Sequence, residues 1–216
     1  TNSGATLNSS GKVGGAYSFD GSTGYIDSSS LSSQLSGTFS IAMWIYPTTL
    51  TKTHFGASSS SGNGRILFYL DGGTNLWTFR IDDTGDTKQA NADGVITQNA
   101  WNHLVLIMSP DNPIRFFVNG VEPSYSSQQT PTGTMTVTNV NVGAGSYTGG
   151  VHAGEGTDQR GYGGEIDETI IFNRSLSASE VQALYYGGLN GGSGLHANVT
   201  SWNDSFALGV TPSDYQ

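Results

Sequence analysis

The feature that most constrains the fold of this 216-residue chain is a series of short apolar runs, each closed by turn-forming residues. The clearest run, from Thr38 to Pro47, is rich in β-branched and aromatic residues and stops at a proline. Such residues favour strands, and proline is excluded from the middle of a sheet. Comparable runs recur over 16–21, 25–27, 65–70, 76–81, 101–108, 114–118, 137–142 and 164–172. This spacing, with turn signals between the runs, predicts an all-β sandwich.

Two local motifs add detail to this prediction. Asn119-Gly120 follows an apolar run and is typical of a type I′ hairpin turn. The sequence 177–180, Ser-Ala-Ser-Glu, has the pattern of a helix capping box, and apolar residues follow it at helical spacing. Gly187 is the predicted stop of this short helix.

The character of the chain changes after the helix. A Gly-rich stretch begins at Gly187, and the segment beyond it has little periodicity. We therefore predict one domain over 1–187 and a linker with a C-terminal extension over 188–216. The extension either packs back on the sandwich or belongs to a following module or a partner chain.

Composition limits the partners. The chain has only 8 Lys and Arg residues and a formal net charge of −9, whereas nucleic-acid binding depends on clustered basic side chains. No apolar run approaches the roughly 18 residues that a membrane-spanning helix needs. The absence of cysteine excludes disulfides and thiolate metal sites, while the acidic balance is compatible with divalent cations. Because the chain does not begin with Met, we expect a processed piece of a longer protein.

A set of motifs in a fixed order carries a family resemblance. The motifs are Gly11–Ala16, Phe19-Asp20-Gly21, Phe39–Pro47, Trp101–Leu104, Val118-Asn119-Gly120, Gly164–Glu168 and Phe172–Ser177. In this order the chain resembles the laminin-G-like jelly-roll family of the concanavalin A-like lectin/glucanase superfamily. The resemblance implies a two-sheet antiparallel jelly-roll sandwich in which one sheet is often concave.

The same resemblance implies a calcium site. Members of the family often carry a structural calcium that joins the first strands to the last. Asp20 and Asp167 match its usual side-chain ligand positions, and the Gly21 carbonyl is the third predicted ligand. Backbone carbonyls and waters would complete the roughly six to eight oxygens that calcium takes. The alternative is that Asp20 forms an Asx turn and Asp167 caps backbone amides.

Two acidic segments are candidates for other roles. The segment 82–86, Asp-Asp-Thr-Gly-Asp, lacks the ligand pattern of an EF-hand loop and is interpreted as a solvated turn. The segment 165–168, Glu-Ile-Asp-Glu, superficially resembles the acidic strand of retaining glucanases on the same fold. Glu165 and Asp167 share a face, but the next position on that face is Thr169 rather than a third acid. We therefore do not expect a hydrolase.

Glycan recognition is the favoured function. Aromatic rings stack on the C–H faces of sugars, while amide, carboxylate and guanidinium groups bind the hydroxyls. The predicted ligand-binding residues are Tyr69, Trp77, Tyr147, Asp158, Arg160 and Tyr162, of which the last four belong to a long Gly-rich loop over 143–164. Core packing is the alternative for Trp77. The four histidines are scattered, which predicts no zinc site.

The sequence thus predicts a non-catalytic carbohydrate-binding or adhesion module of an extracellular or surface protein, stabilised by calcium. The alternative is a structural protein-interaction domain, such as a virion or filament surface decoration, that binds no sugar. The expected ligand is a glycan or polysaccharide. The expected protein partners are other modules of the same polypeptide or assembly. We expect a location outside the cell, on its surface or on a virion.

Overall fold

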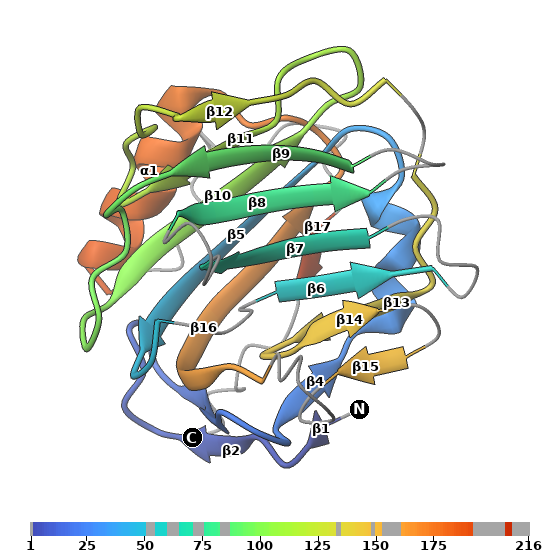
Figure 1. The fold of residues 1–216 in the computed structure, drawn as a ribbon. Helices are drawn as coiled ribbons and strands as arrows, with labels where there is room; N and C mark the ends of the chain where they lie inside the picture. The colour runs from blue at the N-terminus through green and yellow to red at the C-terminus, as the bar shows by residue number, and fades with distance from the viewer. Residues whose placement is uncertain are drawn as a thin grey trace.

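The computed structural model describes residues 2–50, 55–59, 65–70, 76–82, 87–132, 135–147, 150–152, 161–191 and 206–208. For 145–147, 150–152 and 206–208 it describes the backbone alone. Two antiparallel sheets lie face to face, and one short helix packs on the outside (Figure 1). This confirms the predicted all-β sandwich with a C-terminal helix.

The larger sheet, sheet A, has eight strands within the described residues. Their spatial order is β1 (Asn2–Ser3), β4 (Tyr25–Asp27), β13 (Asn139–Val142), β6 (Phe55–Ser58), β7 (Arg65–Leu70), β8 (Trp77–Asp82), β9 (Thr87–Ala92) and β12 (Ser127–Gln128). Every neighbouring pair in this order is antiparallel.

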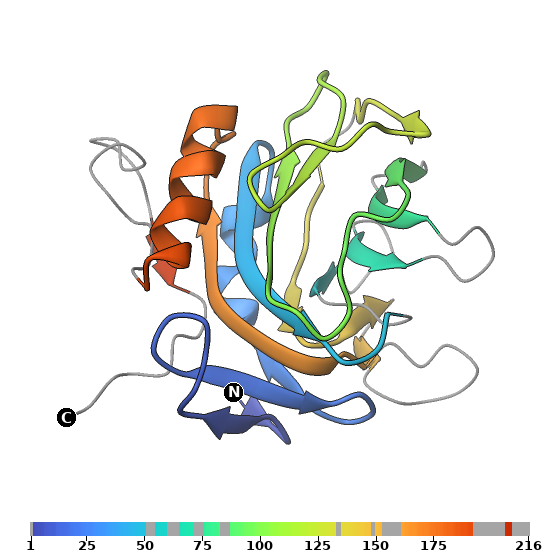
Figure 2. The same cartoon turned by 90° about the vertical axis from the view of Figure 1, so that its left-hand side faces the viewer.

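Sheet B has the order β11 (Arg115–Val118), β10 (Asn102–Met108), β5 (Phe39–Pro47), β16 (Gly163–Phe172), β3 (Ala16–Asp20) and β2 (Thr6–Asn8). Strand β17 (Phe206–Leu208), from the predicted C-terminal extension, pairs with the end of β16. Figure 2 shows the helix, sheet B and sheet A as successive layers.

The main core lies between the sheets. Side chains alternate between the two faces of a strand, and the inward set of sheet A is apolar: for example, Ile66 and Phe68 of β7 and Phe79 of β8 are fully buried. A second apolar cluster lies on the other face of sheet B, beneath the helix. It consists of Ala42, Val105, Ile107, Phe117, Ile170, Phe172, Leu176, Val181 and Leu184. Beneath the helix, sheet B is therefore apolar on both faces.

Helix α1 (Ala178–Leu189) begins where the capping box predicts. Ser177 accepts a hydrogen bond from the Glu180 amide, and the Glu180 carboxylate accepts one from the Ser177 amide. Among the described residues, no helix has both the length and the apolar character needed to cross a membrane.

The predicted helix stop at Gly187 is wrong, because α1 continues through two glycines to Leu189. These glycines are buried, and a Cβ atom on Gly188 would lie 2.4 Å from Nε1 of Trp44. The glycines therefore allow the helix to approach the sheet closely rather than end it. The predicted domain boundary between 187 and 188 falls inside α1.

Several elements lie where no strand was predicted. Strand β9, Thr-Lys-Gln-Ala-Asn-Ala, is largely polar, and only its alanines face the core. The polar connection after β4 contains a 3₁₀ helix, η1 (Ser29–Leu35). The predicted long loop over 143–164 contains a hairpin of β14 (Gly145–Tyr147) and β15 (Gly150–His152). The type I′ turn is confirmed, since Asn119 and Gly120 both have positive φ.

His103 on β10 provides a test of the packing beneath α1. It is 3% exposed, its ring contacts those of Trp44 and Tyr185, and its Nδ1 has no hydrogen-bond partner among the described residues. Burial lowers the pKa of His103 to about 3. In the unfolded chain this imidazole is protonated below about pH 6.5, whereas in the folded chain it stays neutral down to about pH 3. The free energy of unfolding therefore falls as the pH drops through this range.

We expect this single group to reduce the free energy of unfolding by about 2 kcal/mol between pH 7 and pH 5. Urea denaturation at the two pH values measures the change. In His103→Phe the loss between pH 7 and pH 5 should shrink by that amount. An unchanged pH dependence in the variant would contradict the burial of a neutral imidazole.

Candidate functional site

Two of the predicted ligand-binding aromatic residues belong to the core. Trp77 is 2% exposed, and its ring stacks on Phe68 with 5.4 Å between centroids. Tyr162 is fully buried, its ring contacts Phe19 edge-on, and its hydroxyl donates to the Glu165 carbonyl at 3.0 Å. Both predictions of ligand contact are therefore wrong. Trp77 occupies an inward position of β8, and Tyr162 enters the core just before β16 begins.

Three other predicted residues are placed in part or not at all. Tyr147 lies on β14, where the backbone alone is described. Asp158 and Arg160 lie outside the described residues. The remaining prediction, Tyr69, is on β7 and is half-buried.

Tyr69 faces away from the core, on the outer side of sheet A that is turned to the viewer in Figure 1. The strand register places it beside Thr78 of β8, which in turn lies beside Asn91 of β9. The next row on the same face contains Arg80 and Gln89. We call this set, Tyr69, Thr78, Arg80, Gln89 and Asn91, the Tyr69 face. It combines one aromatic ring with amide, hydroxyl and guanidinium groups.

Ionic contacts hold the guanidinium of this face in position. Nε of Arg80 donates to Asp82 at 2.8 Å, and Nη2 donates to the Thr87 hydroxyl at 3.2 Å. Burial alone would lower the pKa of Arg80. The hydrogen bonds that Arg80 donates to Asp82 and to the Tyr69 hydroxyl outweigh burial, so the pKa of Arg80 is raised above its ordinary value. Arg80 is therefore charged and fixed next to the Tyr69 ring.

Asp82 also binds a second arginine. Arg65, across the strand pair, lies 2.6 Å from the Asp82 carboxylate. Asp82 is thus the last residue of β8 and an ion-pair partner, not part of a solvated turn as the 82–86 segment predicted. The rest of that segment lies outside the described residues.

Two buried amides on the outer side of sheet A have unused hydrogen-bonding groups. Asn91 is only 9% exposed, yet its Oδ1 has no hydrogen-bond partner within the described part of the chain. Asn141 of β13 is fully buried, and neither atom of its amide has a partner there. Buried polar atoms are nearly always hydrogen-bonded, and exceptions point to a bound molecule or a functional constraint.

The predicted calcium ligands do not come together. Asp20 lies opposite Gly163 in the antiparallel pair of β3 and β16, so Asp167 lies four residues further along β16. At about 3.3 Å per residue this separation is about 13 Å. The predicted site shared by Asp20, Gly21 and Asp167 is therefore wrong, because the antiparallel register places the two carboxylates at opposite ends of β3. No cluster of three or more His, Asp or Glu among the described residues could hold a metal.

Each of the two aspartates instead makes the contacts of the alternative interpretation. Asp20 accepts amide hydrogen bonds from Ser22, Thr23 and Gly24 and hydroxyl hydrogen bonds from Ser22 and Thr23. These bonds, led by the Ser22 and Gly24 amides, hold the pKa of Asp20 far below its ordinary value. The exposed carboxylate thus closes an Asx turn at the end of β3.

Asp167 is 1% exposed and fixes the chain that leads into β3. One carboxylate oxygen accepts from the Val13 amide and the other from the Glu168 amide, both at 2.8 Å. Gly11 lies so close that a Cβ atom on it would be 2.7 Å from Oδ2 of Asp167. This contact joins the Gly11–Ala16 motif to the Gly164–Glu168 motif.

The acidic segment of β16 has the predicted facing. Glu165 pairs with Tyr46 and Asp167 with Trp44, so the two carboxylates share the outer face of sheet B. Glu165 accepts a hydrogen bond from the Asn8 amide at 2.8 Å. A register shift follows Asp167, where Glu168 has a positive φ. The carboxylates of Glu165 and Asp167 are thus engaged in contacts that hold strands and loops together.

Sequence reasoning missed Arg80, Asn91 and Asn141. The signal for Arg80 was present, since it alternates with the inward residues Phe79 and Ile81. What the sequence lacked was the pairing of β7, β8 and β9, which brings these polar residues next to Tyr69.

Comparisons with known proteins agree with this architecture. The family model described as the concanavalin A-like lectin/glucanases superfamily matches residues 20–182. No curated protein sequence matches the chain significantly.

Solved structures that are similar to this chain share its fold at low sequence identity. The CBM40 domain of a Ruminococcus gnavus sialidase bound to α2,3-sialyllactose has a TM-score of 0.61 and 15% identity, covering 79% of this chain and 96% of that one. Domain 4 of the extracellular arabinanase AbnA from Geobacillus stearothermophilus, in complex with arabinotriose, has a TM-score of 0.60 and 19% identity, covering 84% and 81%. A heptameric SAP-like pentraxin from Limulus polyphemus has a TM-score of 0.54 and 18% identity, covering 81% of each chain.

Proposed function

Because the chain belongs to the Laminin_G_3 family of the concanavalin A-like lectin/glucanase superfamily, we propose that it is a non-catalytic carbohydrate-binding module whose ligand lies on the Tyr69 face. The observation that carries the proposal is the unused acceptor Oδ1 of buried Asn91, in the same cross-strand row as the half-buried ring of Tyr69. A sugar supplies both missing partners, a C–H face for the ring and a hydroxyl for the amide.

The charge of the face fits a ligand rich in hydroxyl groups. Arg80 is held by Asp82 and Thr87, so its guanidinium keeps one position without help from a ligand. A fixed donor loses little conformational entropy when a ligand binds. Gln89, half-buried beside Arg80, adds an amide that can donate and accept.

The similar structures support the same class of ligand. The AbnA domain is in complex with arabinotriose, and the CBM40 domain is bound to sialyllactose. Those ligands belong to those proteins, and they support an oligosaccharide as the class of ligand here. The proposal also assigns the module to an extracellular or surface protein, where such glycans are accessible.

Tyr69→Ala tests the proposal directly. We expect binding to the best ligand from a glycan array to weaken by about tenfold, because removing an aromatic contact removes on the order of 1 kcal/mol or more. Isothermal titration calorimetry measures the change. Asn91→Ala should weaken binding as well, since it removes the unused acceptor.

Tyr186→Ala is the matched control, because Tyr186 is an exposed tyrosine on α1, 59% exposed and far from the Tyr69 face in the fold. It should bind as the wild type does. If Tyr69→Ala binds normally, or if both tyrosine variants lose affinity equally, the ligand does not lie on the Tyr69 face. If no glycan binds at all, the structural protein-interaction alternative replaces this proposal.

The proposal includes no hydrolysis. The acids that resemble a glucanase strand are Glu165 and Asp167, and the hydrogen bonds from Asn8 and from the backbone engage their carboxylates. A retaining glycosidase needs two carboxyl groups free to flank a sugar bond. No reducing sugar should be released from any bound glycan, and Glu165→Gln should leave binding unchanged.

Calcium binding stays a prediction, now limited to Asp20. The Asp20 carboxylate and the hydroxyls of Ser22 and Thr23 are oxygen ligands of the type that calcium prefers, within 2.9 Å of Oδ2. An ion there would replace the two hydroxyl hydrogen bonds. At a concentration near tenfold the dissociation constant we expect calcium to raise Tm by about 2–5 °C.

Differential scanning fluorimetry in calcium and in EDTA measures this shift. Asp20→Asn should show the same Tm in both solutions, while Asp167→Asn should keep the wild-type shift. If the wild-type Tm is equal in calcium and in EDTA, Asp20 serves only its turn.

A further inference from the structure

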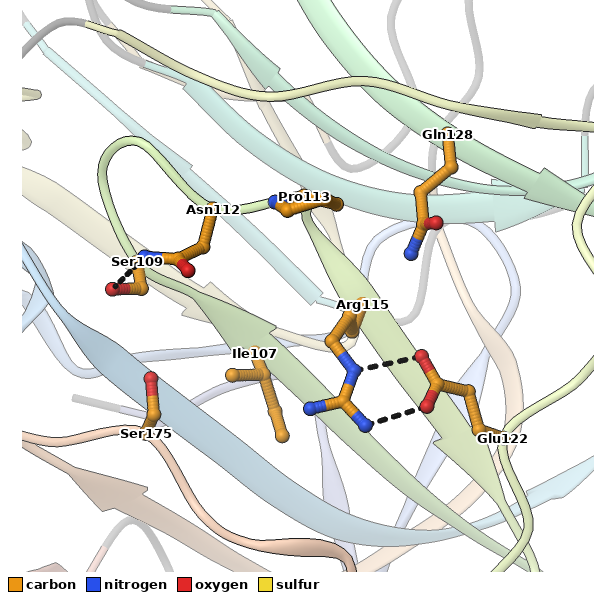
Figure 3. Close-up of a pocket in the computed structure, with 8 residues that line it drawn as sticks. All are labelled: Ile107, Ser109, Asn112, Pro113, Arg115, Glu122, Gln128 and Ser175. Atoms are coloured by element: carbon orange, nitrogen blue, oxygen red, sulfur yellow. Dashed lines mark hydrogen bonds and ion pairs between the residues drawn. The ribbon is translucent and has the colours of Figure 1, made fainter.

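A cavity of about 480 Å³ lies beside β11, an edge strand of sheet B, and also takes a lining residue from β12, an edge strand of sheet A (Figure 3). Its floor is Ile107 of β10, which belongs to the apolar cluster on the outer side of sheet B. Its walls come from the loop after β10, from β11, from β12 and from the turn before α1. Its volume is within the range of about 300–1,000 Å³ that is usual for small-molecule sites.

We propose that this cavity is a second saccharide site, which takes one neutral sugar unit through two neighbouring hydroxyl groups. The choice of a sugar among neutral polyhydroxy compounds rests on the proposed function. The position and the neutrality of the site rest on the ion pair of Arg115 and Glu122 and on the neutral residues around it.

The charged groups of the cavity neutralise each other. Arg115 and Glu122 form a bidentate pair, with Nε to Oε1 at 2.7 Å and Nη2 to Oε2 at 2.5 Å. Figure 3 shows this pair on one side of the cavity. A charged ligand would have to compete with this pair for one of its partners, whereas a neutral ligand leaves it intact.

The pair still has hydrogen-bonding groups for a ligand. A guanidinium has five N–H groups, and Glu122 uses two of them, so three remain among the described contacts. Each carboxylate oxygen can accept more than one hydrogen bond. Two neighbouring hydroxyls of a sugar can therefore donate to Glu122 and accept from Arg115 at the same time.

The surroundings of the pair hold it in one geometry. The Arg115 guanidinium lies over the Phe117 ring at 4.9 Å, and the Tyr125 hydroxyl donates to Glu122 at 3.0 Å. Burial alone would raise the pKa of Glu122, but the hydrogen bonds from Arg115 and Tyr125 outweigh it and keep that pKa below its ordinary value. The carboxylate is thus ionised, an acceptor rather than a donor.

The rest of the lining is neutral. Polar groups come from Ser109, Asn112, Gln128 and Ser175, and apolar surface comes from Ile107 and Pro113. The apolar pair can cover the C–H face of a sugar, while hydroxyls and amides bind its remaining oxygens. This combination suits a neutral sugar better than an ionised one, which would gain no unpaired opposite charge.

Nuclear magnetic resonance of the whole chain tests the proposal. The probes are methyl glycosides of neutral hexoses and pentoses, added up to about 50 mM because a ligand with so few contacts is expected to bind in the millimolar range. The Nε–H signal of Arg115, assigned with Arg115→Lys, reports on the cavity. Glucuronic acid and N-acetylneuraminic acid serve as charged probes.

We expect at least one neutral glycoside to shift the Arg115 signal with saturation, and the acidic sugars to bind more weakly. Arg115→Met/Glu122→Gln removes both charges together, so no single charge is left without a partner, and binding at this site should weaken at least about tenfold. Ser175→Trp fills the cavity from an exposed position and should block binding without touching the ion pair. Tyr69→Ala should leave the titration unchanged within about twofold.

Other outcomes overturn the inference. If no neutral glycoside shifts the signal, or if Ser175→Trp titrates like the wild type, the cavity is not a saccharide site. If an acidic sugar binds more tightly than every neutral one, the ligand class is wrong. These failures leave the proposed function intact, since that proposal is tested separately by the effect of Tyr69→Ala on glycan binding.

Discussion

Asp167→Ala is expected to lower the free energy of unfolding by about 3–5 kcal/mol, because two backbone amides, one of them buried, lose the charged carboxylate that accepts their hydrogen bonds. Asp167 is 1% exposed and accepts from the amides of Val13 and Glu168. Losing both bonds frees the lead-in loop from β16 and exposes the start of β3. Urea denaturation at pH 7 measures the change, and the same m-value in both proteins would show that the folded state is otherwise retained.

Asp20→Ala is the matched control for Asp167→Ala. Asp20 is the other aspartate predicted to bind calcium, but it is exposed and its contacts are local to one turn. Asp20→Ala should lower the free energy of unfolding by clearly less than Asp167→Ala does. The effect of Asp20→Ala should be the same with or without the Asp167 substitution. Equal losses that vanish together in EDTA would instead mean that one ion links the two carboxylates, contrary to the register of β3 and β16.

Trp77→Ala is expected to cost about 3–5 kcal/mol, the usual loss when a buried aromatic side chain is deleted from a core. The Trp77 ring stacks on Phe68, which also contacts Phe116 of sheet B, so the cavity would open between the two sheets. Thermal and urea denaturation should both report the loss. Any weakening of glycan binding should be explained by the unfolded fraction alone.

Tyr69→Ala gives the opposite pattern. Tyr69 is the neighbouring aromatic residue on the outer face, half-buried and outside the core, so its removal should change stability by less than about 1 kcal/mol while glycan binding weakens. A folded, stable Trp77→Ala that has lost its ligand would reverse these assignments and make Trp77 the sugar-binding ring.

Trp77 also shows why a core aromatic residue was predicted from sequence to bind a ligand. Trp77 begins β8 and Tyr69 is the second-last residue of β7, and nothing in either residue type separates a core ring from a ligand-binding ring. Alternation is the usable signal: Trp77 is in phase with Phe79 and Ile81, whereas Tyr69 is out of phase with Ile66 and Phe68. The phase indicates the core face only once one inward residue is known.

Asp20 and Asp167 illustrate a different limit. The resemblance identified both positions, and each has a definite structural role. Their predicted meeting depended on how β3 and β16 align, and the antiparallel register separates them by the length of β3. Similarly, Arg115 and Glu122 are only seven residues apart across the Asn119-Gly120 turn, but the cavity beside them gave no signal in the sequence, because its lining also comes from β10, β12 and the turn before α1.

The sequence by itself determined the strand runs, the type I′ turn, the capping box and membership of a two-layer β fold, because these follow from residue shape, backbone preference and contacts between residues close in the chain. The tertiary structure alone decided which tyrosine faces outward, that two glycines bring α1 against Trp44, and that the Asp167 carboxylate accepts from the Val13 amide. Those outcomes depend on pairing and packing between strands that are distant in sequence, and a single strand carries no information about its partner or register.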